Sequence, residues 1–114
     1  MVSWLQRIQS YPAPPFHKRV WIALLRIPKG KVVTYQTLAR MAGNPLAPRA
    51  VGNACNRNPF APHVPCHRVV AADGGLGGYD LGVRKKKQLL RRENIQVDAR
   101  GHIDLSRFGY FPMK

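Results

Sequence analysis

The sequence predicts one small α/β domain with a winged helix-turn-helix-like core. Its 114 residues match the usual size of a single domain and are too few for two independent hydrophobic cores. Two short helical segments joined by a turn rich in glycine and proline predict the helix-turn-helix, and a β-branched run before them predicts a small sheet. Hydrophobic residues make up 45% of the chain, so we expect it to fold.

The first fifteen residues are expected to form an extended lead-in to a domain that covers residues 16–114. Three prolines within residues 11–15 oppose a helix at that point. Apolar residues then recur at helical spacing, which predicts an amphipathic core helix over residues 16–27. The sequence Pro-Lys-Gly at residues 28–30 ends this helix.

The helix-turn-helix is expected between residues 31 and 56. Residues 31–35 are a short β-branched run that predicts an extended strand. The Thr34 hydroxyl is a suitable N-cap for a helix over residues 36–41. After a turn with glycine and two prolines, a second helix is predicted over residues 49–56.

A strongly basic helix is predicted over residues 83–93. Its apolar residues Val83, Leu89 and Leu90 are expected to face the core. Its cations, at residues 84–87 and 91–92, are expected to face outward. The spacing therefore predicts an amphipathic helix whose outer face carries only positive charge.

Loops and a tail complete the chain. Residues 73–78 are rich in glycine, which predicts a turn where the backbone approaches a ligand or another segment closely. This cluster does not match the glycine fingerprints of dinucleotide-binding or phosphate-binding loops. Residues 95–114 are expected to add a short strand pair around Gly101.

The charge balance indicates a polyanionic partner. The chain has 19 Lys and Arg against 5 Asp and Glu, for a formal net charge of +14. Charge of one sign at this density opposes compaction, so a folded domain that carries it is typical of nucleic-acid binding. An acidic membrane surface is the rival partner. The outward cations of the basic helix would face solvent or DNA.

The remaining composition excludes several classes. No stretch approaches the roughly 20 apolar residues that span a bilayer, and the N-terminus has no secretory signal. We therefore expect an intracellular protein, cytoplasmic or nuclear, with no membrane partner. Cys55 and Cys66 lack the density of a disulfide scaffold and the spacing of a zinc site, so free thiols and no metal are expected.

Cys66 and His67 form a candidate nucleophile and base. A thiol becomes strongly nucleophilic when an imidazole or a cationic field favours the thiolate. Pro65 restricts the backbone on one side, and Arg68 is among nearby cations expected to lower the cost of the thiolate. The alternative is a small buried hydrophobic residue, the commoner role of a lone cysteine.

Residues 65–69 read Pro-Cys-His-Arg-Val, and this string resembles the active-site signature of the O6-alkylguanine-DNA alkyltransferases. The resemblance extends from about Phe16 to Ile95 and includes residues 28–35, 49–52, 58–59 and 77–79. It covers the C-terminal active-site domain of that family only. Many members carry an additional N-terminal domain, of which this sequence has no trace beyond its lead-in.

The resemblance implies a role for each member of the candidate active site. Cys66 would accept the alkyl group of a flipped-out guanine and become a stable thioether. His67 would act as a water-mediated base, Glu93 would orient it, and Asn58 would brace the network. Tyr35 would crowd the target phosphate and assist protonation of the guanine. The alternatives are an ion pair between Glu93 and cations of its own helix, and a core aromatic role for Tyr35.

The resemblance also implies how the chain holds DNA. Arg49 matches the family's intercalating arginine, which enters the duplex from the minor-groove side and fills the vacated stack. Ala50 and Gly52 on the same helix suit close approach to the groove, and Arg57 completes the expected DNA-binding set.

The expected substrate pocket is lined by Val64, Pro65, Val69, Tyr79 and Asp80. Tyr79 would stack over the base. Asp80 departs from the family, which usually has a small hydroxyl residue there to bind the guanine O6. Either the Asp80 carboxylate turns away, or its N–H binds the oxygen, or it is protonated.

We therefore expect a DNA-repair methyltransferase that uses no metal or soluble cofactor and acts once per molecule. Its partner would be double-stranded DNA containing O6-alkylguanine, bound by a monomer that can act cooperatively along DNA. The alternative is a lesion sensor that binds O6-alkylguanine and recruits repair factors, as in alkyltransferase-like proteins that replace the cysteine, usually with tryptophan. A third possibility, a sequence-specific regulator, is disfavoured by the small residues of the second helix.

Overall fold

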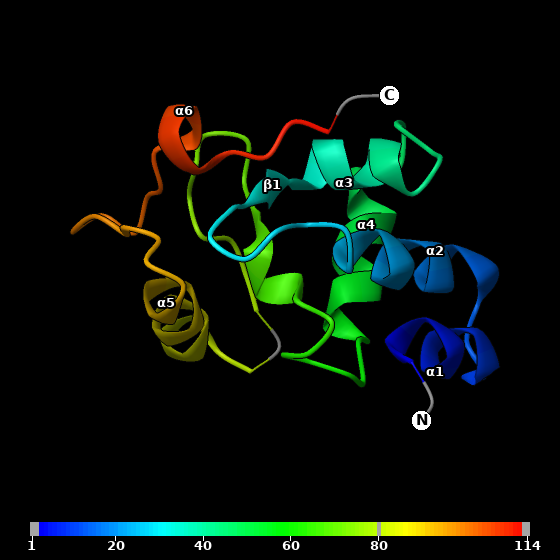
Figure 1. Ribbon diagram of the computed structural model, residues 1–114. Helices are drawn as coiled ribbons and strands as arrows, with labels where there is room; N and C mark the ends of the chain where they lie inside the picture. Colours follow the sequence, from blue (N-terminus) through cyan, green and yellow to red (C-terminus); the bar gives the residue numbers. More distant parts are fainter. Residues whose placement is uncertain (1–2, 80, 113–114) are drawn as a thin grey trace.

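The computed structural model describes residues 3–79 and 81–112. The elements in chain order are α1 (Trp4–Ser10), α2 (Pro15–Leu24), β1 (Val33–Thr34), α3 (Tyr35–Met41), α4 (Pro48–Asn56), the 3-10 helix η1 (Cys66–Arg68), β2 (Val69–Val70), α5 (Val83–Arg92) and α6 (Leu105–Phe108). Helices α1 to α4 lie on one side of the small sheet, and α5 and α6 lie on the other (Figure 1). None of the described helices is long and apolar enough to cross a membrane.

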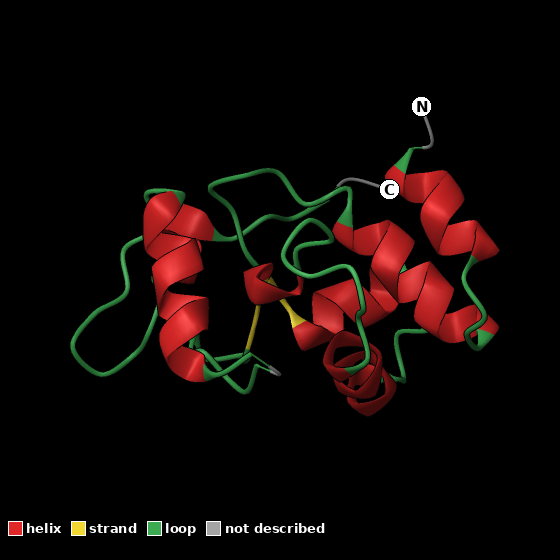
Figure 2. Cartoon of the chain, turned by 90° about the horizontal axis from the view of Figure 1, so that it is seen from below, coloured by secondary structure: helices red, strands yellow, loops and turns green. Residues whose placement is uncertain are grey.

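A two-stranded parallel sheet separates two hydrophobic cores (Figure 2). Val33 of β1 lies opposite Val69 of β2, and α3 and α4 form the crossover that parallel strands require. Successive strand side chains point to opposite faces. Val33 and Val69 therefore pack among the α1–α4 residues, whereas Val32 and Val70 pack with α5 and the tail.

The helix-turn-helix consists of α3 and α4. The Thr34 hydroxyl accepts the Thr37 N–H at 3.1 Å, which confirms the predicted cap of α3. Gly43 has a φ of +93° in the turn between the helices, a conformation that glycine adopts without strain. The buried indole of Trp21 in α2 donates to the Ala54 carbonyl at 2.8 Å and holds α4 against α2.

The predicted extended lead-in is wrong for residues 4–10, which form α1. Ser3 and Gln6 form a reciprocal capping box, which stabilises the first turn and offsets the short length of the helix. Ile8 is fully buried, and Trp4 stacks on His63 with ring centroids 4.9 Å apart. The boundary between residues 1–15 and 16–114 stays a prediction.

Two details of α5 also differ from the sequence prediction. Val83, expected in the core, is 43% exposed, and Lys86, expected outside, is fully buried. Leu89 and Leu90 are buried as predicted. The reason is rotation of the helix: Lys86, Leu90 and Glu93 lie three or four residues apart and share its inner stripe.

Among the described residues of the tail, no strand pair forms around Gly101. Residues 98–102 make a tight turn, in which the Asp98 N–H donates to the His102 carbonyl at 2.9 Å. This turn pairs with the glycine loop instead, through an antiparallel bridge between Gly75 and His102. The glycine loop, rather than a second tail strand, therefore provides hydrogen-bond partners for the Gly101 carbonyl and the Ile103 N–H.

Candidate active site

The Glu93 carboxylate ties together three segments that are distant in the sequence. Glu93 follows the last residue of α5, and its side chain is 9% exposed. Its Oε2 lies 2.8 Å from His67 Nε2, and Arg68 donates to both carboxylate oxygens at 2.8 and 2.9 Å. The Gly30 N–H donates to Oε1 at 3.2 Å. Burial acts to raise the pKa of Glu93, but these hydrogen bonds outweigh it and lower the pKa.

His67 is held in one tautomer by this contact. A carboxylate only accepts hydrogen bonds, so Nε2 carries the proton and Nδ1 carries the lone pair. Nδ1 is buried and has no hydrogen-bond partner among the described residues. Burial lowers the pKa of His67 despite the opposing effect of Glu93. At neutral pH the ring is therefore a neutral base with Nδ1 as its accepting atom.

Cys66 begins η1 and is only 4% exposed. Burial raises the pKa of its thiol, although a hydrogen bond from Asn58, the positive charge of Lys86 and a hydrogen bond from Tyr79 act to lower it. Lys86 thus has the effect that was expected of nearby cations, but burial outweighs it. Arg68 is paired with Glu93, and the resting thiol is protonated.

Asn58 braces the loop that leads to Cys66. Its amide nitrogen donates to the Val64 carbonyl at 2.8 Å, and its amide oxygen accepts the Phe60 N–H at 2.9 Å. Phe60 packs edge-on against Trp4 and Trp21, which joins the loop to α1 and α2. The loop thus has a defined shape, and the hydrogen bond from Asn58 to the thiol follows from it.

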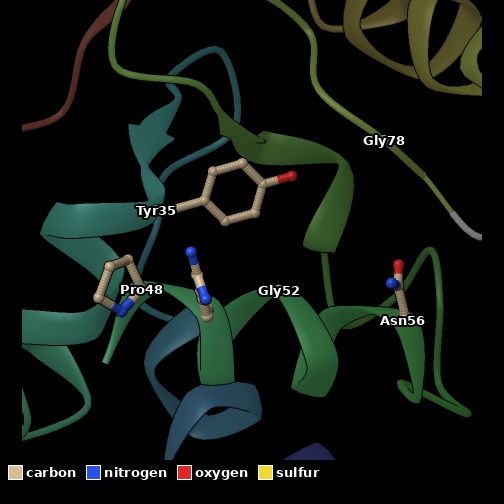
Figure 3. A pocket seen from close by; sticks show the side chains of 6 residues that line it. Tyr35, Pro48, Gly52, Asn56 and Gly78 are labelled. Carbon is tan, nitrogen blue, oxygen red and sulfur yellow. The ribbon is translucent and has the colours of Figure 1, made fainter. Parts of the chain in front are cut away.

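A groove of about 360 Å³ lies between α4 and the glycine loop. Its lining residues are Tyr35, Pro48, Arg49, Gly52, Asn56 and Gly78. Figure 3 shows Pro48, Gly52 and Asn56 along α4, with Tyr35 and Gly78 across from them. A Cβ on Gly52 would meet no protein atom within 4 Å, so its absence leaves the groove open to a partner.

Tyr35 joins the groove to the thiol. Burial, followed by the nearby Cys55 and Cys66, raises the pKa of its phenol, which is therefore protonated at neutral pH. Gly77 has a φ of +69°, and a Cβ there would lie 3.0 Å from the Tyr35 hydroxyl oxygen. Glycine at this position lets the loop pass close to the phenol.

The structure brings only part of the predicted DNA-binding set into this groove. Tyr35, Arg49 and Gly52 line it, whereas Ala50 is half-buried outside it. Arg57 is exposed and lines a separate hollow. Asn56 lines the groove although the sequence reading passed over it. Its place one helical turn after Gly52 was the available signal.

The predicted pocket residues surround the thiol on its protein side. Val64 and Val69 are fully buried and share a core cluster with Cys66, against which Tyr79 packs. Pro65 directly precedes η1 and is buried. The predicted pocket role of Asp80 lies outside the described residues.

Lys86 is a residue that the sequence reading missed. Its ammonium donates to the carbonyl oxygens of Val69 at 2.6 Å and Gly78 at 3.2 Å, and also to that of Leu76. It therefore ties β2 to the loop that borders the groove. Burial lowers the pKa of Lys86 to about 8, with smaller opposing effects from Cys55 and Cys66. A single Lys between other cations gives no sequence signal of burial.

Metal chemistry has no ligand set among the described residues, where no group of three or more His, Cys, Asp and Glu side chains is arranged to hold an ion. Cys55 and Cys66 are both free thiols, as predicted. Burial raises the pKa of Cys55 to about 12, so it is the weaker nucleophile of the two by ionisation.

Residues 15–95 match the protein family described as "6-O-methylguanine DNA methyltransferase, DNA binding domain". The Escherichia coli protein named bifunctional transcriptional activator/DNA repair enzyme Ada is 55% identical over 78 residues, which are 68% of this chain and 22% of Ada. The methylated-DNA–protein-cysteine methyltransferase of Methanosarcina acetivorans is 54% identical over 78 residues, 68% of this chain and 50% of that protein. This chain thus spans half or less of these relatives.

Two solved structures share the fold. S. pombe Atl1, solved in complex with damaged DNA containing O6-carboxymethylguanine, has a TM-score of 0.79 at 30% identity, over 90% of this chain and 100% of that one. Mycobacterium tuberculosis OGT, solved in complex with DNA, has a TM-score of 0.70 at 45% identity, over 84% and 56% of the two chains. The predicted small α/β, helix-turn-helix-like fold class is confirmed.

The buried Lys86 predicts an unusual dependence of stability on pH. Between about pH 8 and pH 10.5 the unfolded chain holds a proton on this lysine that the folded chain has lost. Through Lys86 alone, raising the pH across this window favours folding by about 1.4 kcal/mol per pH unit, whereas the raised pKa values of Cys55, Cys66 and Tyr35 act in the opposite direction above about pH 9. We expect urea unfolding to show this rise for the parent protein relative to Lys86→Met. The control is Lys85→Met, at the half-buried neighbouring lysine, and its stability should depend on pH as that of the parent does. Equal pH dependence of the parent and Lys86→Met would contradict the prediction.

Proposed function

The chain belongs to the family of the 6-O-methylguanine DNA methyltransferase DNA-binding domain, and we propose that it is a DNA-repair protein that transfers the alkyl group from guanine O6 to its own Cys66. The observation that carries this proposal is the hydrogen-bonded series of Glu93 and His67, which adjoins the buried Cys66 in the chain, in a domain with a groove on the second helix of its helix-turn-helix. This series follows the general order of orienting group, base and nucleophile.

The proposed reaction begins with removal of the thiol proton. Because Cys66 is protonated at rest, it needs a base, and the neutral Nδ1 of His67 accepts the proton through a bridging water. Glu93 then stabilises the imidazolium that forms. Burial of all three groups strengthens this charge interaction.

In the next step the thiolate attacks the alkyl carbon. A C–S bond forms, the bond between that carbon and O6 breaks, and its electron pair leaves with the guanine. The departing guanine anion takes a proton from the Tyr35 phenol, which is protonated at neutral pH; the phenoxide regains a proton from water, and His67 releases the Cys66 proton to water. The products are unmodified guanine and a thioether on Cys66. A thioether has no good leaving group, so each molecule acts once.

The groove on α4 supports extrusion of the base from a duplex. Arg49 is exposed at the start of α4, where its long side chain reaches the vacated position in the stack. The absence of a side chain at Gly52 allows the backbone of α4 to approach DNA closely. Tyr35 on the opposite wall faces the target nucleotide. The high net charge supplies affinity for phosphates with little dependence on sequence.

The alternative is a lesion sensor that holds O6-alkylguanine without reacting. Similarity to S. pombe Atl1 over 90% of this chain favours it, because that structure holds a damaged base of this class. The thiol distinguishes the two functions. A sensor needs a pocket for the damaged nucleobase. It does not need a proton acceptor such as His67, with an orienting carboxylate, beside a cysteine.

The central experiment is intact-mass measurement after incubation with duplex DNA that contains O6-methylguanine. We expect each chain to gain one methyl group in place of the thiol hydrogen, and peptide mapping to locate it on Cys66. Label should reach about one group per chain and then stop, because the thioether is stable.

Cys66→Ala provides the matched control. It should retain binding to the damaged duplex and acquire no label on His67 or Cys55. Binding without methylation by the parent protein would support the sensor instead. Continued turnover, or label on Cys66→Ala, would contradict the assignment of Cys66 as a single-use acceptor.

A second prediction concerns the role of Arg49. Arg49→Ala should slow transfer from duplex DNA about tenfold or more, because unstacking a base costs a few kcal/mol that an intercalated side chain offsets. Transfer from the free O6-alkylguanine base should be nearly unchanged, since a free base needs no extrusion. Rates on both substrates, measured for the parent and the variant, test this. Equal losses on the two substrates would show that Arg49 does not act as the wedge.

A further inference from the structure

The outer face of α5 carries cations that the proposed chemistry does not use. Arg84, Lys87, Gln88 and Arg91 lie three or four residues apart and form one stripe along the helix, here called the α5 strip. Arg84 and Arg91 are exposed and Lys87 is half-buried. The opposite stripe of the same helix holds Lys86 and leads to Glu93.

The charges of the α5 strip are not explained by the folding of the helix. Among the described residues, none of its cations forms an ion pair. Like charges three and four residues apart destabilise a helix by a few tenths of a kcal/mol each. Glu93, which follows the helix, does not relieve this, because it is occupied by His67 and Arg68. An external anion is therefore the partner that this pattern fits.

The α5 strip lines a hollow that continues beyond the helix. A groove of about 500 Å³ is lined by Val83 and the four strip residues. A second hollow of about 530 Å³ shares Arg91 with it and ends at Arg107. The two hollows, here called the α5 hollows, are lined by four cations, Arg84, Lys87, Arg91 and Arg107, and by no Asp or Glu among the described residues.

The α5 hollows lie outside the groove on α4. Gly78 lines the groove on α4, and α5 begins five residues later. Figure 1 shows α5 and α4 on opposite sides of the sheet. The nine residues of α4 cover about 13 Å, or roughly four base pairs, whereas the longest dimension of the molecule, 40 Å, corresponds to about twelve. Most of a bound duplex would thus extend past the groove on α4.

We propose that the α5 strip binds the phosphate backbone of the same DNA duplex, in the segment that flanks the one held by α4. The strip spans about 10 Å of helix and presents three cations, enough for three successive phosphates of one strand. Its contacts are to the backbone, so they add affinity and orientation without reading sequence. The inference rests on the proposed function only for the identity of the polyanion.

The test compares two variants that each lose three positive charges. The strip variant combines Arg84→Gln, Lys87→Gln and Arg91→Gln, and glutamine keeps the helix propensity. The control variant combines Arg26→Gln, Lys29→Gln and Arg100→Gln, which replace exposed cations outside both grooves. Affinity for unmodified duplexes is measured against salt concentration, so the result does not depend on alkyl transfer.

On a duplex of about 24 base pairs, log K falls with log salt, and the magnitude of this negative slope should be smaller by about 2 to 3 in the strip variant than in the parent. Each lost phosphate contact accounts for about 0.9. The control variant should keep the slope of the parent. On a duplex of about 8 base pairs, which covers little beyond the α4 groove, the parent and the strip variant should have equal slopes.

Three results would overturn the proposal: an unchanged slope for the strip variant on the long duplex, an equal reduction by the control, or complexes that hold two duplexes on one protein molecule. Transfer from the free O6-alkylguanine base is measured in parallel and should be the same for all three proteins. Loss of that reaction in the parent would count against the proposed function and leave the salt test of the α5 strip intact.

Discussion

The Glu93 carboxylate is the contact on which the arrangement of the site depends. It holds the ring of His67, the Nε and Nη2 of Arg68 and the backbone N–H of Gly30, and so joins α5, η1 and the turn before β1. A buried carboxylate is stable only when it is paired and hydrogen-bonded, and each of its partners is also oriented by it. Arg68 in turn donates to the Ile27 carbonyl at 2.8 Å, which links the site to the end of α2.

Helix α5 then acts on the site through its inner stripe and on the surroundings through its outer one. Inside, Lys86 fixes the loop that passes Tyr35, and Glu93 fixes the tautomer of His67. Outside, the α5 strip has only solvent or an anion to face. The inner residue Lys86 and the outer α5 strip belong to the same helix, and Glu93 follows its last residue. A contact made by the strip therefore acts on the element that positions the site.

Local patterns accounted for much of the fold. The Thr34 cap, the helix-turn-helix and the candidate pair of Cys66 and His67 were predicted from caps, turns and short motifs, which are encoded within a few neighbouring residues, whereas Glu93, Asn58 and Tyr35 came from the family resemblance. The Ser3 and Gln6 capping box is also a local pattern, but the expectation of an extended lead-in rested on the three prolines alone.

The rest depended on contacts between distant segments. The burial of Lys86 needs three carbonyl oxygens from β2 and the glycine loop, and no local pattern contains them. The Cys66 thiol is protonated because η1 is deeply buried, and the charged residues next to Cys66 in the sequence do not predict this. The turn at residues 98–102 likewise pairs with the distant Gly75 in addition to its own internal hydrogen bonds, and no local pattern contains that contact.

The central claim is that Glu93 holds His67 as a neutral base with an unprotonated Nδ1 beside the thiol. Nitrogen-15 NMR of the imidazole at neutral pH, with His67 assigned by substitution, tests it directly. The account predicts a protonated Nε2 and an unprotonated Nδ1, and a change of tautomer balance in Glu93→Gln. An imidazolium at neutral pH, or a proton on Nδ1, would contradict it, because His67 would then have no site with which to accept the proton of Cys66.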